Sequence, residues 1–379
     1  TTSNLATQVP FTNVDLRSSS PRAVYYGQNQ LSKNPITLDR KKDLNTGSGA
    51  IFGISGSGKS VLAKGGEIIP TLLRHTEDQI IIVDPEAEYV DIGREFGAEI
   101  INVAPGSSNH FNLLDLPEQD KLQAEDSDPI GQKANLLTTL FENIFSEVSD
   151  EEFAMIDRVT RLTYEQFPKP TLREWQKGME AQPEEVAKAL ALKAEPYTMG
   201  SNDIFAHPTN VNMNNRFVIF NLKQLSGKLK PFALLVIQDY IWNQVVNHQG
   251  KTTTWLYFDE LQLYFKNKIQ ATFFTELYSR IRKYGAIPTG ITQNPETVLS
   301  MEEGRKLVAN CEFLVLLKLK LTDLEALSQV FTLTPSLERF VLRPKAKGTG
   351  LIVAGDTIVP FENPIPKNTK LYQLVATDS

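Results

Sequence analysis

Short stretches in which apolar or β-branched residues predominate alternate with amphipathic stretches along most of this chain. The apolar stretches span residues 50–52, 79–84, 99–103, 216–221, 252–258, 287–294 and 312–319. Apolar stretches of this length are typical of parallel strands that are covered on both faces. Helical spacing of apolar residues lies between several of them. The alternation therefore predicts an α/β core with a mostly parallel sheet flanked by helices.

The pattern changes near residue 116. From there to about residue 205 strand signals vanish, and helical spacing appears over residues 134–145, 151–167, 171–179 and 183–193. We expect an all-helical subdomain inserted into the core, with many carboxylates on solvated faces. A partner-docking surface is a compatible alternative. The predicted domains are a first part of the core over 1–115, the insertion over 116–204 and a second part of the core over 205–379.

Local signals fix several further elements. Residues 23–26 and 35–38 predict short strands in a lead-in that packs on the core. Residues 85–96 predict a helix that Gly97 ends. Pro70 lies inside the helical pattern after residue 61, which predicts a kink. Residues 228–247 are apolar nearly all round and predict a buried helix. Helices over 323–331 and 336–342 and a hairpin of 350–354 with 357–361 close the chain.

Residues 53–60 fit the pattern G-x-x-x-x-G-K-[ST] of phosphate-binding loops. An apolar strand runs into the loop and a helix follows it, as the motif requires. Backbone N–H groups of such a loop cradle a triphosphate, Lys59 reaches the β- and γ-phosphates and the Ser60 hydroxyl ligates Mg²⁺. The positive end of the helix favours the anion. The predicted nucleotide-binding residues are Gly53, Ser55, Gly56, Ser57, Gly58, Lys59, Ser60 and Val61.

An acidic pair, Asp259 and Glu260, ends the strand over residues 252–258. A phosphate-loop enzyme needs a carboxylate at the end of a neighbouring strand to hold Mg²⁺, directly or through water. Asp259 suits that role, and Glu260 can take a proton from the attacking water. The predicted cofactors are therefore ATP and Mg²⁺, with Ser60 and Asp259 as metal ligands.

Two further features are candidates for the catalytic site. Gln293 lies in the polar end of the strand over residues 287–294, where it could orient the lytic water or sense the γ-phosphate. The alternative is a capping role at the start of the next helix. Arg280 and Arg282 lie at the basic end of a helix begun near residue 271. Either is a candidate arginine finger for a neighbour's triphosphate, with Arg282 slightly favoured, or both only stabilise the helix end.

Composition and charge leave this picture unchanged. Of 379 residues, 41% are hydrophobic and 22% charged, which is ordinary for a soluble protein. A single cysteine, Cys311, excludes internal disulfides and a Cys-rich metal site and fits a reducing, cytosolic compartment. The net charge of −6 argues against a generally basic surface for nucleic acid. We find no signal peptide or membrane-spanning run. The opening Thr-Thr-Ser is expected of a piece of a longer protein.

The chain resembles the C-terminal ATPase domain of the VirB-four (TraE-like) ATPases of type IV secretion and conjugation machines. These belong to the FtsK–HerA branch of RecA-like motors. The similar stretches are residues 9–12, 25–27, 34–36, 56–60, 84–89, 258–260, 282–285, 292–294, 348–352 and 358–361. The nucleotide motifs are generic, whereas the run 84–89, the end at 292–294 and the terminal hairpin are more specific. Members of that family carry an N-terminal domain ahead of the region that the resemblance covers.

The resemblance implies a RecA-like phosphate-loop core and an ATP hydrolase that powers substrate transfer or pilus assembly. It implies a cytoplasmic position at the inner face of the cell membrane. The implied partners are a coupling ATPase, inner-membrane subunits and, as an open question, DNA. A hexamer would be the working form, and an isolated domain could be monomeric. Asp84 and Glu86 would lie near the nucleotide, unless they only cap a strand end.

Two other functions stay open. One is a coupling-protein-like or HerA/FtsK-like DNA translocase, which hydrolysis only in the presence of DNA would favour. The other is a nucleotide-binding scaffold without turnover, against which Lys59, Asp259 and Glu260 speak.

Overall fold

The structure is a computed structural model. It describes residues 15–117, 128–145, 147–225, 227 and 229–376. The sequence motif at residues 9–12 lies outside the described residues.

Within the described residues, eleven strands form one sheet in the order β2-β1-β11-β10-β9-β3-β8-β7-β4-β6-β5. They are β1 Val24–Asn29, β2 Pro35–Leu38, β3 Gly49–Phe52, β4 Gln79–Asp84, β5 Glu99–Asn102, β6 Phe217–Asn221, β7 Thr254–Phe258, β8 Ala286–Thr292, β9 Phe313–Leu316, β10 Thr349–Ala354 and β11 Thr357–Glu362. β3 pairs in parallel with β8 and β9, and β5 with β6. Antiparallel pairs join β1, β2, β9, β10 and β11. The predicted α/β class is confirmed.

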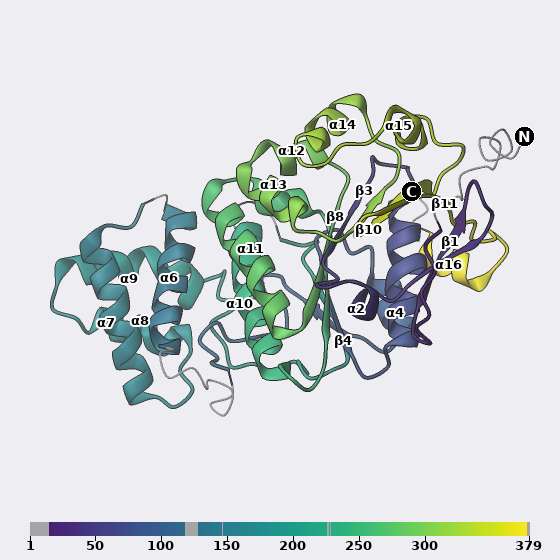
Figure 1. Ribbon diagram of the computed structural model, residues 1–379. Helices are drawn as coiled ribbons and strands as arrows, with labels where there is room; N and C mark the ends of the chain where they lie inside the picture. The colour runs from purple at the N-terminus through teal and green to yellow at the C-terminus, as the bar shows by residue number, and fades with distance from the viewer. Residues whose placement is uncertain (1–14, 118–127, 146, 226, 228, 377–379) are drawn as a thin grey trace, which may run out of the picture. The chain divides into compact units, whose positions relative to one another are not determined.

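Helices occupy most of the chain between the parallel strands (Figure 1). They are α2 Arg40–Asp43, α3 Lys59–Val61, the π-helix η1 Leu62–Ile68, α4 Ile69–Arg74, α5 Val90–Glu95, α6 Pro129–Phe145, α7 Asp150–Gln166, α8 Leu172–Glu180, α9 Glu185–Thr198, α10 Leu229–His248, η3 Leu261–Phe265, α11 Lys268–Ile281, η4 Arg282–Tyr284, α12 Pro295–Ser300, α13 Glu302–Ala309, α14 Leu321–Ser328, α15 Pro335–Leu342 and α16 Lys370–Val375. None of the helices in the described ranges is long and apolar enough to cross a membrane.

The chain divides into two compact units. The first comprises Thr1–Ile80, Trp255–Phe265 and Ile287–Ser379, and the second comprises Ile81–Thr254 and Lys266–Ala286. The predicted helical insertion over 116–204 falls inside the second unit. Its proposed boundaries stay a prediction.

In the first unit one continuous helical segment follows β3. It begins as α3, widens into η1 and returns to α-helical geometry at α4, where Pro70 occupies the first turn. Proline is tolerated there because the first N–H groups of a helix have no partner inside it. Glu67 of η1 is buried and accepts hydrogen bonds from Tyr26 Oη at 2.5 Å and Arg40 Nη1 at 2.5 Å. The hydrogen bond from Tyr26 ties the segment to β1, and the ion pair with Arg40 ties it to α2.

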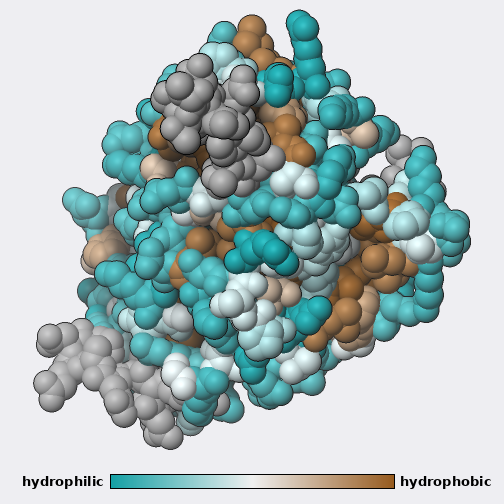
Figure 2. Space-filling view, turned by 45° about the vertical axis from the view of Figure 1, so that its right-hand side comes forward, coloured by the Kyte–Doolittle hydropathy of each residue, from teal (hydrophilic) through white to brown (hydrophobic). Residues whose placement is uncertain are grey.

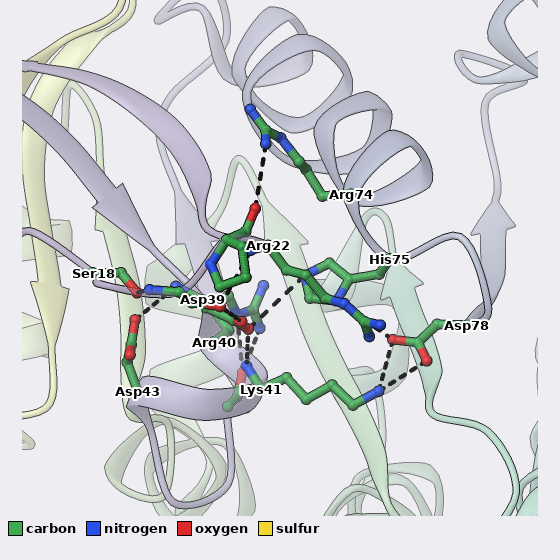
Figure 3. A network of polar contacts seen from close by, with 12 residues as sticks. Ser18, Arg22, Asp39, Arg40, Lys41, Asp43, Arg74, His75 and Asp78 are labelled. Carbon is green, nitrogen blue, oxygen red and sulfur yellow. Dashed lines mark hydrogen bonds and ion pairs between the residues drawn. The ribbon is translucent and has the colours of Figure 1, made fainter.

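A second polar network holds the far end of the segment (Figure 3). His75, the residue after α4, is buried with its ring between Asp39 at 3.9 Å and Asp78 at 3.6 Å. Lys41 Nζ donates to both oxygens of Asp78 at 2.9 and 3.1 Å. Burial lowers the pKa of His75, although the two aspartates act in the opposite direction. The neutral imidazole therefore belongs to the folded state at neutral pH.

In the second unit the helices α6 to α9 confirm the predicted helical stretch, and Figure 1 shows them side by side. No strand lies between β5 and β6 in the described part of this stretch. Capping boxes start two of the helices: Ser149 with Glu152 at α7, and Thr171 with Glu174 at α8. The helix predicted over 228–247 is α10, and its buried residues lie on all sides.

One predicted helix is shorter than expected. The sequence predicted a helix from residue 85, but α5 begins at Val90. The Asp84 carboxylate accepts the backbone N–H groups of Glu88 and Tyr89, both at 2.9 Å, and Ala87 has φ +60°. This turn replaces the first helical residues because its hydrogen bonds compete with those of a helix. Gly97 ends α5 with φ +70°, as predicted.

The surface is largely polar. Figure 2 shows a face on which hydrophilic residues predominate and hydrophobic ones gather in separate patches. Among the described residues, the large hydrophobic side chains more than 60% exposed are Leu73 at 63% and Leu192 at 71%. Scattered apolar residues of this kind are normal for a globular protein.

Candidate functional site

The phosphate loop leaves the carboxyl end of β3, a strand whose four residues are all buried. β3 lies between β8 and β9 and runs parallel to both. Ligands of open α/β sheets bind beyond the carboxyl ends of the strands, so the loop is where such a ligand is expected. Gly58 has φ +96°, and a Cβ there would lie 2.7 Å from Gly348 N. Only glycine fits, because Gly348 N donates to Ser57 O at 2.8 Å.

The side chains of the loop leave polar groups available to a ligand. Ser57 is 4% exposed, and its hydroxyl has no hydrogen-bond partner among the described residues. Lys59 is 9% exposed at the start of α3, followed by the half-buried Ser60 and Val61. A buried hydroxyl without a protein partner is uncommon, and a phosphate oxygen could accept its hydrogen bond. Lysine, hydroxyls and the first N–H groups of a helix together fit a polyphosphate.

Asp259 and Glu260 follow β7 directly, and both are buried, at 2% and 8% exposed. Glu260 has φ +49°, a left-handed conformation that costs a non-glycine residue of order 1 kcal/mol or more. Its backbone N–H donates to Asp259 Oδ1 at 2.9 Å. The turn thus fixes both carboxylates at the end of the strand. Strain of this kind is common at functional sites.

Two glutamines orient the Glu260 carboxylate. Gln293 Nε2 donates to Glu260 Oε1 at 2.9 Å, and Gln262 Nε2 donates to Oε2. Gln262 Oε1 accepts the Thr292 hydroxyl at 2.5 Å. Gly53 N in turn donates to Thr292 O at 3.3 Å. These bonds connect the phosphate loop, the end of β8 and the acidic pair within the first unit.

The remaining predicted residues belong to the second unit. Glu86 is 54% exposed at its side chain and lies 3.6 Å from Lys230 Nζ. Asp84 caps the turn before α5, the structural role that the sequence left open. The Arg280 guanidinium lies over the Trp242 ring, 4.2 Å from its centroid. Arg282 begins η4, just after α11. The roles proposed for these residues stay predictions.

Comparison with known protein families identifies this fold. The family described as "Helicase HerA, central domain" matches this chain over residues 24–238, which is more than half of its length. The chain belongs to this family. With an intact phosphate loop and the acidic pair, this HerA-family chain is a phosphate-loop ATPase.

Solved structures agree on the fold. VirB4 of Thermoanaerobacter pseudethanolicus superposes with a TM-score of 0.79 at 22% identity, covering 93% of this chain and 98% of that one. The bacterial conjugative coupling protein TrwBdeltaN70 in its unbound form has a TM-score of 0.58 at 15% identity, covering 95% of each chain. The plasmid coupling protein TrwB in complex with ADP and Mg²⁺ has a TM-score of 0.56 at 16% identity, also with 95% of each chain. No curated protein matches.

Two parts of the site of this HerA-family chain were not predicted from its sequence. Gln262 lies in η3, and only the folded turn brings its amide to Glu260. Gly348 is distant from the phosphate loop in the sequence, yet its backbone N–H donates to Ser57 O. The sequence signal for this approach is the stretch 348–352, one of those that carry the family resemblance.

Proposed function

We propose that this chain is the ATP-hydrolysing motor domain of a bacterial type IV secretion or conjugation system, and that it powers substrate transfer or pilus assembly. The observation that carries the proposal is the likeness to VirB4 over 93% of the chain at a TM-score of 0.79. The TrwB coupling proteins fit less closely, at 0.56 to 0.59. A DNA translocase of the coupling-protein kind is therefore the less favoured alternative.

In this proposal Lys59 stabilises charge on the β- and γ-phosphates. Ser60 and Asp259 would hold Mg²⁺, which their hydroxyl and carboxylate oxygens suit. Mg²⁺ would neutralise the charge that develops between the β- and γ-phosphates. Glu260 takes the proton of the attacking water, with Gln262 and Gln293 holding its two oxygens in place. The buried loop hydroxyl of Ser57 is a further phosphate contact.

Partners and location follow from the same proposal. The motor would act as a hexamer at the inner face of the cell membrane, with a coupling ATPase and inner-membrane subunits as partners. An arginine from the next subunit would complete each site, and Arg282 is the preferred candidate because Arg280 already lies on Trp242.

Steady-state hydrolysis of Mg·ATP tests the proposal. Lys59→Ala should lose nucleotide binding, whereas Glu260→Gln should keep binding and lose about 10²-fold or more in turnover. Glu296→Gln, an exposed glutamate on α12, is the matched control and should keep the wild-type rate. Wild-type turnover by Glu260→Gln would remove Glu260 as the base. Turnover that depends on added DNA would favour the translocase instead.

A further inference from the structure

Thr292 ends β8, the strand that lies between β3 of the phosphate loop and β7 of the acidic pair, and it is 0% exposed. Its backbone oxygen accepts the N–H group of Gly53 at 3.3 Å. Its hydroxyl accepts the N–H group of Asn294 at 3.0 Å and donates to Gln262 Oε1 at 2.5 Å. One buried residue thus contacts the phosphate loop through its main chain and the support of Glu260 through its side chain.

The hydrogen bonds around this hydroxyl have one consistent direction. A hydroxyl carries one hydrogen and two lone pairs. The Asn294 N–H can only donate, so it uses a lone pair of Thr292 Oγ1 and leaves the hydroxyl hydrogen for Gln262 Oε1. The oxygen of the Gln262 amide therefore faces Thr292, and its NH2 group faces Glu260 Oε2. A reversed amide would place two acceptors against each other and leave a buried hydroxyl unpaired, which is costly.

The backbone that carries Gln262 is also held against β8. A Cβ on Gly290 of this strand would lie 2.6 Å from Leu261 Cδ2, and Leu261 is 0% exposed. Glycine at this position makes room for the residue that precedes Gln262. The donor and the acceptor of the bond between Thr292 and Gln262 therefore belong to elements that pack directly on each other.

Gln293 differs from Gln262, although both donate to Glu260. Gln293 is exposed, and its Oε1 has no partner among the described residues. Gln262 is half-buried, and Thr292 holds its Oε1. Water competes for the amide of an exposed side chain, and a side chain with one contact keeps more rotamer freedom. Gln262 is therefore the fixed support of the carboxylate, and Gln293 is the adjustable one.

We propose that Thr292 is a positioning residue of the ATPase and acts through Gln262 on the orientation of the Glu260 carboxylate. Without the hydroxyl the amide of Gln262 can reverse, so Glu260 loses its fixed donor. The bond between Gly53 N and Thr292 O does not involve the side chain and stays. The inference rests on the proposed role of Glu260 as the base. It gives the Thr292 hydroxyl a part in turnover and none in nucleotide binding.

The test separates turnover from binding. The kcat for Mg·ATP is measured together with the Kd for the non-hydrolysable analogue ADPNP with Mg²⁺, by isothermal titration. Thr292→Val keeps the shape of the side chain without its hydroxyl and should lower kcat about tenfold at an unchanged Kd. Thr292→Ser keeps the hydroxyl and should stay within about twofold of the wild-type kcat. The control is Thr289→Val, on the same strand and also 0% exposed, whose hydroxyl accepts Arg40 Nη2 at 2.8 Å. It should lower only the thermal stability.

Gln262→Ala tests the same link from a half-buried position, without a change in the core. Its kcat should fall as far as that of Thr292→Val, and the double variant should fall no further, because Thr292 acts only through Gln262. Wild-type kcat in Thr292→Val, equal losses in Thr292→Val and Thr292→Ser, a weakened Kd that accounts for the loss, or additive losses in the double variant would each overturn the proposal. Wild-type turnover by Glu260→Gln would instead refute the base of the proposed function, and that outcome is distinct from the others.

Discussion

The buried carboxylate of Glu67 allows a quantitative test of how the phosphate-loop helix is held. Its oxygens accept hydrogen bonds from Tyr26, Arg40 and Tyr257, the last at 3.1 Å. The side chains of Arg40 and Glu67 are 0% and 1% exposed. Burial opposes the charged form of Arg40, yet Glu67 raises the pKa of Arg40 overall, so the guanidinium stays charged. The variant Glu67→Gln removes the opposing charge and keeps the volume.

The expected loss in the free energy of unfolding follows from the partners that Arg40 keeps in Glu67→Gln. Gly47 O and Thr289 Oγ1 still accept its N–H groups, and the Phe313 ring centroid lies 4.5 Å from Arg40 Cζ. None of these carries a negative charge. Removing one partner of a buried pair costs about 3 to 5 kcal/mol, because the other charge stays buried. With the glutamine amide oxygen in the place of Oε1, Arg40 and Tyr257 can still donate to it, and the amide NH2 can donate to the Tyr26 hydroxyl oxygen. We therefore expect a loss near the lower figure.

The assay is urea unfolding without nucleotide, together with hydrogen exchange of peptides that cover residues 59–74. The exchange measurement is needed because a chain of two units need not unfold in one step. The control is Glu362→Gln, whose partner Lys33 is 58% exposed, so the loss should be below about 1 kcal/mol. If the free energies of unfolding of the two variants agree within error, the buried pair does not stabilise this helix and the reasoning is wrong.

Three further predictions follow from the structure. Because burial lowers the pKa of His75, its contribution to stability is complete above the ordinary value of 6.5 and is lost as the pH falls through the lowered value; His75→Gln should flatten this part of the stability curve measured by urea unfolding. Replacing residues 116–204 by a Gly/Ser linker should leave the Kd for ATP within a few-fold, and loss of the fold or of binding would contradict a separate insertion. Arg282→Ala and Glu260→Gln subunits should each be inactive, and their mixture should recover ATP hydrolysis; no recovery in co-assembled mixtures would exclude Arg282 as a finger in trans.

The parts of the fold that the sequence predicted are those with local causes. Residues 80–83 are all apolar because both faces of β4 are buried, and the bounds of β4 agree with the predicted strand over 79–84. The phosphate loop, the acidic pair and the helices α6 to α9 were likewise visible, since each depends on neighbouring residues. Predicted strand ends differ from the observed ones by one to three residues, as at β9, where pairing rather than pattern sets the end.

What could not be predicted depends on partners far apart in the chain. Glu67 is buried in the middle of a helical segment, and its partners Tyr26, Arg40 and Tyr257 stand 41, 27 and 190 positions away in the sequence. Periodicity carries no information on such pairs, because burial of a carboxylate is decided by the donors that the fold brings to it. The role of Gln262 could not be predicted for a similar reason, because its hydrogen bond to Glu260 depends on the left-handed turn after β7.

The glycines of the phosphate-loop helix show how local cost and long-range packing are balanced. Gly65 and Gly66 lie next to each other in η1, where each lowers helix stability by about 1 kcal/mol relative to alanine. A π-helical turn in this place is also uncommon and frequently marks a functional site. The two glycines and the π-helical turn are tolerated because tertiary contacts hold the segment. Arg40 binds Glu67, and the Ile365 side chain packs against Gly65. The position of the helix that carries Lys59 therefore depends on segments near both ends of the described chain. A substitution in either segment should alter triphosphate binding even though the substituted residue makes no contact with the triphosphate.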